Sequence, residues 1–166
     1  YISGAANLYG TNYLEGGTVI KFAQGAGAVI DVKGKLVGDT DTYRPAVLTA
    51  SADATVGESI GGTLSGYYAS PALNFDYVTS GELASLQNLR ILYAVTGVKF
   101  NGGSGHELRH LQLVNCGDAV RADNAQYAIR NVLGWNLTNA LTGSTSTGAW
   151  EHATFNGVTN LLASAV

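Results

Sequence analysis

The stretch Leu111-Gln-Leu-Val-Asn-Cys-Gly-Asp-Ala-Val120 recurs in outline through the second half of the chain, and this recurrence decides the fold. Four segments superimpose at successive offsets of 22, 21 and 21 residues, with apolar residues at matched positions. A fixed period near 21 residues is typical of a solenoid, in which each repeat buries its apolar face by stacking on its neighbours. Two of the matched columns are Leu89, Leu111, Val132 and Ala153, and Val98, Val120, Leu141 and Leu162.

The residues within each repeat favour short strands over helices. Gly, Thr and Asn interrupt every stretch before apolar residues can recur at helical spacing over three turns. A repeat of this length is too short for a propeller blade of ~40 residues, and the leucine-rich repeat pattern fits only in patches. The sequence therefore predicts parallel pairing of each strand with its equivalent one coil on. Strands are expected at residues 19–22, 28–32, 46–49, 72–75, 98–100 and 111–114.

The repeat pattern, apolar-x-apolar-x-Asn-apolar-x-x-small-apolar, resembles the right-handed parallel β-helix repeat of the pectin-lyase-like superfamily. The resemblance covers residues 86–166, although Gly157 replaces the asparagine of the fourth copy. Residues 17–22, 29–36 and 45–49 look like the opening coils of secreted bacterial β-helix proteins. The resemblance implies an all-β, right-handed parallel β-helix of roughly six or seven coils with about 21 or 22 residues per coil in the second half.

The chain is long enough for one domain that buries roughly 70% of its unfolded surface without a disulfide or metal. We expect a single β-solenoid over residues 1–166, with an N-terminal segment or cap at 1–17 and opening coils at 18–50. A Gly- and Ser-rich loop excursion is expected at 51–71, followed by regular coils at 72–166. Cys116 shares an apolar column with Ala94 and Leu137, so we interpret it as a small buried hydrophobe.

Composition excludes several partners. Only 13% of the residues are charged and the net charge is −3, which gives nucleic acid or an anionic membrane no general electrostatic foothold. No apolar run approaches the ~20 residues of a transmembrane helix. The chain opens on Tyr1 without signal-peptide features, and we expect a processed or excised part of an extracellular or cell-surface protein.

The column alignment also tests for catalytic and metal-binding clusters. His110 and His152 share a polar column with Asn88 and Asn131, but two coils of ~4.8 Å separate the histidines, which is awkward for a single metal. We expect a hydrogen-bonded ladder at a corner of the coil. No column of the repeats holds two acids, and the pectate lyase and polygalacturonase motifs are absent, so the resemblance carries over no catalytic residue.

Two weaker patterns point to ligands. Asp39, Asp41 and Asp53 offer oxygen ligands that suit calcium, although turn-forming aspartates also account for them. A basic strip would suit an acidic polysaccharide, although solvated charges on an outer face explain the same residues. The strip comprises Lys99, Arg121, Arg109 and Arg130.

The ends of the solenoid suggest assembly. The last coil is apolar to its final residue, and unpaired strand edges template further strands. We expect contacts through Tyr1, Tyr9, Tyr13, Tyr67, Tyr68, Leu161, Leu162 and Val166. The expected function is a non-catalytic extracellular structural solenoid, without cofactor, that assembles head to tail as a filament or surface-stalk subunit. Two alternatives stay open: a polysaccharide-binding or polysaccharide-cleaving β-helix, and an adhesin or autotransporter passenger segment.

Overall fold

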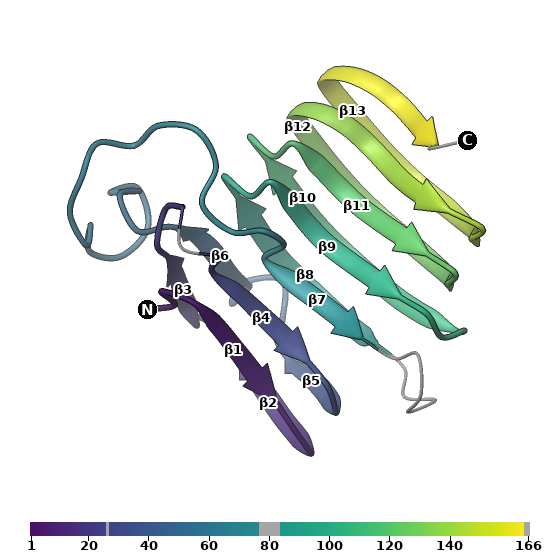
Figure 1. The fold of residues 1–166 in the computed structure, drawn as a ribbon, viewed down its shortest axis with the longest axis horizontal. Helices are drawn as coiled ribbons and strands as arrows, with labels where there is room; N and C mark the ends of the chain where they lie inside the picture. Colours follow the sequence, from purple (N-terminus) through teal and green to yellow (C-terminus); the bar gives the residue numbers. More distant parts are fainter. Residues whose placement is uncertain (26, 77–83, 165–166) are drawn as a thin grey trace.

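The computed structural model describes residues 1–25, 27–76 and 84–164, and within these ranges all regular secondary structure is strand. The strands pair in parallel and wind into a β-solenoid of about seven turns (Figure 1). The all-β parallel solenoid predicted from the repeats is therefore confirmed. The strands are β1 (Ala5–Leu8), β2 (Thr11–Glu15), β3 (Val19–Phe22), β4 (Val29–Val32), β5 (Lys35–Asp39), β6 (Ala46–Ala50), β7 (Leu73–Asp76), β8 (Ser85–Leu92), β9 (Thr96–Asn101), β10 (His106–Val114), β11 (Asp118–Asp123), β12 (Gln126–Ser144) and β13 (Thr147–Ser164).

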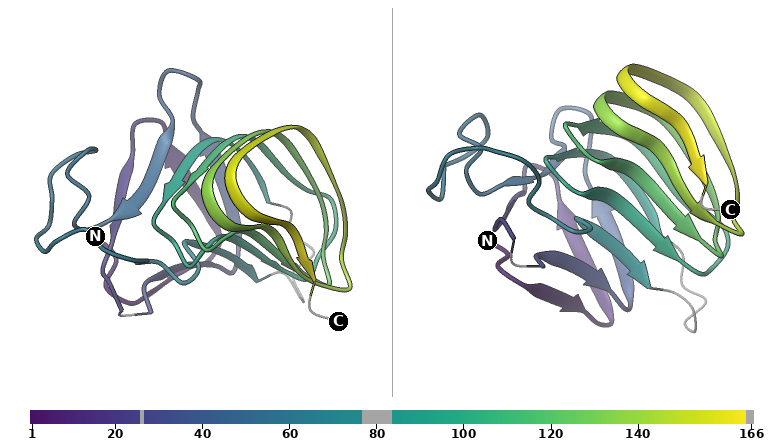
Figure 2. Two further views of the ribbon diagram at one scale, coloured as in Figure 1. Left: turned by 90° about the horizontal axis from the view of Figure 1, so that it is seen from above. Right: turned by 45° about the horizontal axis from the view of Figure 1, so that its top comes forward.

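Each turn of the chain contributes strands to three faces of the solenoid (Figure 2). Within each face, the strands of successive turns pair in parallel. The first face runs β1-β4-β7-β9-β11 and continues into the C-terminal parts of β12 and β13. The second runs β2-β5-β8-β10 and continues into the N-terminal parts of β12 and β13. The third begins with β3 and β6, passes through the C-terminal halves of β8 and β10, and continues into the middle parts of β12 and β13. As a result, the two chain ends lie at opposite ends of the stack.

The strand register agrees with the sequence alignment. Leu111 pairs with Leu89 on one side and with Val132 on the other, and Val132 pairs with Ala153. On the first face, Val120 lies between Val98 and Leu141. The predicted offsets of 22, 21 and 21 residues are therefore confirmed.

The chain turns its corners at residues with positive φ, which explains why polar residues recur at fixed columns. His110 and Asn131 occupy the first corner, both with φ 54°, and Asn115 and Asn136 occupy the second with φ 54° and 53°. Asn and His tolerate this left-handed region better than β-branched residues. The expected ladder is present, because Asn131 Nδ2 lies 3.4 Å from His110 Nδ1. At the second corner Asn136 Nδ2 donates to Asn115 Oδ1 over 2.7 Å.

Side chains of successive rungs fill the core together, by stacking on one another or by filling space that a small residue leaves. Phe100 stacks on Phe75, with ring centroids 5.6 Å apart, and on the imidazole of buried His106, with centroids 4.8 Å apart. Gly134 stands in a column of larger residues, and the Phe155 ring of the next rung fills the space that its missing side chain leaves. Cys116 is buried, as expected, and burial raises the pKa of its thiol to about 12.

The first half does not follow the period of the second: Ala5 pairs with Val29, 24 residues on, and Ile30 pairs with Leu73, 43 residues on. Residues 1–17 do not lie apart as a cap, because β1 and β2 pair with β4 and β5 and form the first rung. The expected excursion leaves the wall after β6 and returns at β7. Buried Asp53 fixes its start: its carboxylate accepts hydrogen bonds from Thr49 and Thr55, and Lys21 Nζ donates to its backbone carbonyl. Residues 77–83, within the expected regular coils, lie outside the described residues.

Candidate functional site

The last described rung presents an apolar layer, on which no other described strand stacks. Leu162 continues the interior column of Val120 and Leu141, yet it is 67% exposed, and its neighbour Leu161 is 65% exposed. Trp150 and Phe155 belong to the same layer, with ring centroids 5.5 Å apart, and both are partly buried against the core. The last described rung thus exposes a cross-section of the core.

The first rung, at the other end of the stack, encloses a cavity that we call the terminal hollow. All three faces of this rung contribute side chains to a cavity of about 390 Å³, among them Leu8, Leu14 and Ile20. Core residues of later rungs, Leu36 and Leu48 among them, also line it. The two ends are therefore unlike but complementary in kind, one an apolar layer and the other an apolar hollow.

The tyrosines expected at assembly contacts lie in different environments. Tyr1 and Tyr9 are exposed on the first rung, and Tyr13 lines the terminal hollow. Tyr68 is buried, and its hydroxyl donates to the Thr63 carbonyl, so it anchors the excursion and does not form a surface contact. Tyr67 lines a lateral cleft beside the second corner. Val166 lies outside the described residues.

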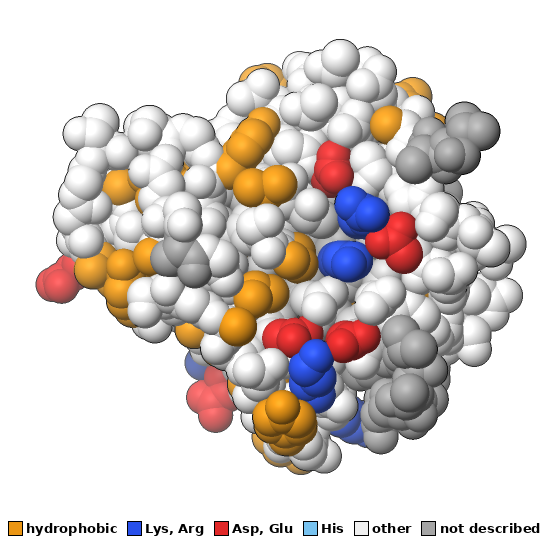
Figure 3. All heavy atoms as spheres, in the orientation of Figure 1, with side chains coloured by type: hydrophobic (Ala, Val, Ile, Leu, Met, Phe, Trp, Pro, Cys, Tyr) orange, Lys and Arg blue, Asp and Glu red, His pale blue; other side chains and the backbone are white. Residues whose placement is uncertain are grey.

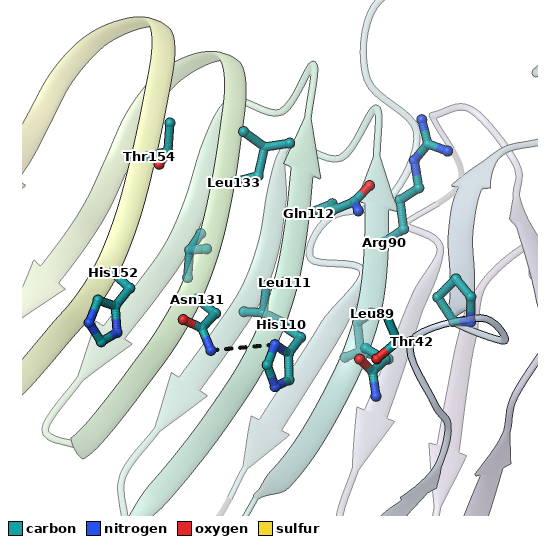
Figure 4. Close-up of a pocket in the computed structure, with 13 residues that line it drawn as sticks. Thr42, Leu89, Arg90, His110, Leu111, Gln112, Asn131, Leu133, His152 and Thr154 are labelled. Carbon is teal, nitrogen blue, oxygen red and sulfur yellow. Dashed lines mark hydrogen bonds between the residues drawn. The ribbon is translucent and has the colours of Figure 1, made fainter.

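An axial groove of about 450 Å³ follows the first corner (Figure 4). Asn131 lies between His110 and His152 on successive rungs, as the column alignment predicted. The residues described as lining the groove include Arg90 and Gln112 but no Asp or Glu. The groove therefore offers hydrogen-bonding amides and imidazoles, and lacks the two carboxylates that glycoside hydrolysis commonly uses.

The basic strip is divided between two faces, and each cation has an acidic neighbour. Lys99 and Arg121 occupy matching positions on neighbouring strands of the first face. Asp123 lies 4.0 Å from the Lys99 ammonium and 2.8 Å from the Arg121 guanidinium. Red and blue side chains accordingly alternate over this face (Figure 3). On the second face, Glu107 lies 2.6 Å from Arg109 and 3.7 Å from Arg130.

The column alignment does not indicate the contacts of Glu107, because this residue stands two positions before Arg109 and so belongs to another column. Arg130 also lies 3.1 Å from Glu151, the pair that the columns suggested. The arrangement is a set of local ion pairs and does not form one cationic track.

The three calcium candidates do not converge on one site. Asp41 Oδ1 accepts from the backbone N–H groups of Tyr43 and Arg44, which makes it a turn former, and Asp39 is exposed at the end of β5. The Asp53 carboxylate is occupied by threonine hydroxyls. Among the described residues, no group of three or more His, Cys, Asp or Glu could hold a metal ion.

Comparisons with known proteins add no relative. No family model matches the chain, and no match was found among curated proteins or solved structures. Within the described ranges, no helix is long and apolar enough to cross a membrane.

Proposed function

We propose that this chain is a non-catalytic, extracellular structural β-solenoid of the pectin-lyase-like type, which assembles head to tail by stacking the first rung of one copy on the last rung of another. The observation that carries the proposal is the pair of unlike apolar ends, with Leu161 and Leu162 exposed at one and a hollow lined by Leu14 and Ile20 at the other. Contact between unlike surfaces is heterologous, and its repetition generates a filament.

Strand pairing and burial both support this mode of contact. Among the described strands, β13 pairs only with β12, so its other edge offers backbone groups to an incoming strand. In the register of the first face, Leu162 would lie over Ala6 of the next copy. Complete burial of each exposed leucine would contribute about 1.5–3 kcal/mol.

The non-catalytic part of the proposal rests on the lining of the axial groove. His110, Asn131 and Gln112 can bind and orient a polar ligand. General acid–base cleavage of a glycosidic bond, by contrast, commonly needs a carboxylate on each side of that bond.

Sedimentation velocity over a concentration series, followed by electron microscopy, tests the assembly. We expect the wild-type chain to form linear particles that lengthen with concentration. Leu162→Lys should hold it as a monomer, because the substitution places a charge within the apolar layer. Leu133→Lys is the matched control, since Leu133 is exposed in the axial groove, away from the last rung, and this variant should assemble like the wild type. A wild-type monomer at every concentration contradicts the proposal, as does equal assembly of the two variants.

A further inference from the structure

The lateral cleft that Tyr67 lines has a volume of about 630 Å³ and lies between the excursion and the second corner of the solenoid; we call it the corner cleft. Its floor follows the corner residues Tyr93, Asn115 and Asn136 on successive rungs and ends at Gly157. Its wall is the segment 64–67 of the excursion, from which the ring of Tyr67, 42% exposed, lines the cleft. The cleft thus combines two aromatic rings with a pair of amides.

The excursion wall is fixed to the solenoid beside the cleft. The Tyr68 amide donates to the Tyr93 carbonyl over 2.7 Å, and Gln24 Nε2 donates to the Ser65 carbonyl over 2.6 Å. Ala69 forms a parallel bridge with Ala94 immediately after. Because both sides of the cleft are held by these bonds, its shape is preorganised for a ligand.

The asparagine ladder leaves hydrogen-bonding groups open in the cleft. Asn136 Nδ2 donates to Asn115 Oδ1, so the Asn115 amide keeps its donor and the Asn136 amide keeps its acceptor. The next rung has Gly157 at this corner and supplies no side chain to continue the ladder. The hydroxyls of Thr138 and Thr159 line the same stretch. A ligand with several neighbouring hydroxyl groups would satisfy donors and acceptors together.

Charge distinguishes this cleft from the other hollows of the described structure. Every residue described as lining it is uncharged. The axial groove, by contrast, contains Arg90, and the terminal hollow contains Glu15. An anionic ligand would find no cation here to compensate its loss of hydration.

We propose that the corner cleft binds a neutral oligosaccharide, with Tyr67 packing against the apolar face of a sugar ring while Asn115 and Asn136 hydrogen-bond its hydroxyls. Amphipathic tyrosine rings suit a ligand that has one apolar and one hydroxylated side. From Tyr93 to Gly157 the floor spans three steps of ~4.8 Å, about the length of a short oligosaccharide. The site goes beyond the structural role proposed above and does not depend on it.

Isothermal titration calorimetry with hexasaccharides tests the inference. The neutral probes are cellohexaose, xylohexaose and mannohexaose, and hexagalacturonate is the acidic probe of equal length. At least one neutral probe should bind, whereas hexagalacturonate should not. Tyr67→Ala should weaken the binding about tenfold, and Tyr67→Phe should retain it because the ring remains. Asn136→Ala should weaken it about fivefold.

Two further variants serve as controls. Tyr43→Ala removes a tyrosine that is 95% exposed outside the cleft and should leave binding unchanged. Leu162→Lys should also bind normally, so failure of assembly and failure of sugar binding are distinguishable. Circular dichroism verifies the fold of each variant. The inference is overturned if no neutral probe binds, if hexagalacturonate binds more tightly, or if folded Tyr67→Ala binds as the wild type does.

Discussion

The two halves of the molecule achieve the same architecture by different means. Between residue 84 and the last rung, interior side chains are buried between their equivalents, as Val120 is between Val98 and Leu141. In the first half, the excursion interrupts the stacking, and an individual buried polar cluster around Asp53 and Lys21 fixes the chain instead. Regular stacking distributes stability over many similar contacts, whereas the interruption concentrates it in a few specific ones. The interruption also supplies the wall of the corner cleft.

The largest expected effect tests the stacking of the regular half. Val120→Asp buries an unpaired charge between two rungs and should lower the free energy of unfolding by about 4 kcal/mol or more, enough to prevent folding of a marginal domain. Leu162→Asp makes an equivalent change in the same column, but at an exposed position. Chemical denaturation should show little loss for Leu162→Asp. Equal losses in the two variants would contradict the difference between interior and terminal rungs.

Asp53→Asn tests how much of the stability of the first half depends on the buried polar cluster around Asp53 and Lys21. The amide keeps the shape of the carboxylate but leaves one buried threonine hydroxyl without its acceptor and removes the charge beside Lys21. We expect a loss of about 3 kcal/mol in the free energy of unfolding and faster proteolysis within residues 54–67. Asp118→Asn is the matched change in the regular half, where the partly buried carboxylate accepts from Asn139 and Thr142. A loss for Asp118→Asn as large as that for Asp53→Asn would refute the contrast.

The same carboxylate sets an acid limit for the first half. Burial alone would raise the pKa of Asp53, but hydrogen bonds from Thr49 and Thr55 and the charge of Lys21 outweigh it and hold the pKa below the ordinary 3.8. The ionised form therefore stabilises the fold above pH 3.8, and this contribution is lost as the pH falls from there through the lowered value.

A smaller pH effect belongs to His106 in the regular half. Burial lowers its pKa below the ordinary 6.5, and the hydrogen bond to the Gly102 carbonyl only partly opposes the shift. Because the unfolded chain binds this proton more readily, stability is full above pH 6.5 and falls as the pH decreases toward the lowered pKa. Urea unfolding from about pH 8 to about pH 5 should show this decrease in the wild type. His106→Gln should remove it and exposed His152→Gln should not; the opposite pattern would assign the titration elsewhere.

The smallest effect concerns the end of the asparagine ladder. At Gly157, with φ 65°, the space beside Asn136 accommodates a Cβ at 3.5 Å. Gly157→Asn should therefore change the free energy of unfolding by no more than roughly 0.5 kcal/mol, because Asn tolerates this backbone region. Gly143→Asn should be far more costly, since a Cβ there would lie 1.9 Å from the Ala122 carbonyl. Thermal melts compare the two glycine variants; a large loss in Gly157→Asn would show that the ladder position requires glycine.

Periodicity explains which features the sequence predicts. The columns of Leu111 and Val120 fixed the register, and the polar column of His110 indicated a corner ladder. The first rung was not predicted, because β1 and β2 pair with β4 and β5 at an offset of 24 residues, outside the period of 21 or 22. The pairing of β4 with β7 was not predicted either, because it spans the excursion and joins Ile30 to Leu73, 43 residues on. The burial of Tyr68 follows from the path of that loop, which no period describes. For the same reason the corner cleft depends on tertiary packing and has no sequence signature.

The central claim is that the first rung of one copy continues the last rung of another, and cross-linking tests it most directly. On the first face, Ala163 ends the outward column that Asn7 begins, so these residues would be neighbours across the contact, about 4.8 Å apart. The double variant Asn7→Cys/Ala163→Cys is treated with a short bismaleimide, while native Cys116 stays buried. We expect a ladder of covalent multimers, whereas each single variant can form dimers at most. Monomers and dimers alone from the double variant, at concentrations where the wild type sediments as long particles, would contradict the head-to-tail register.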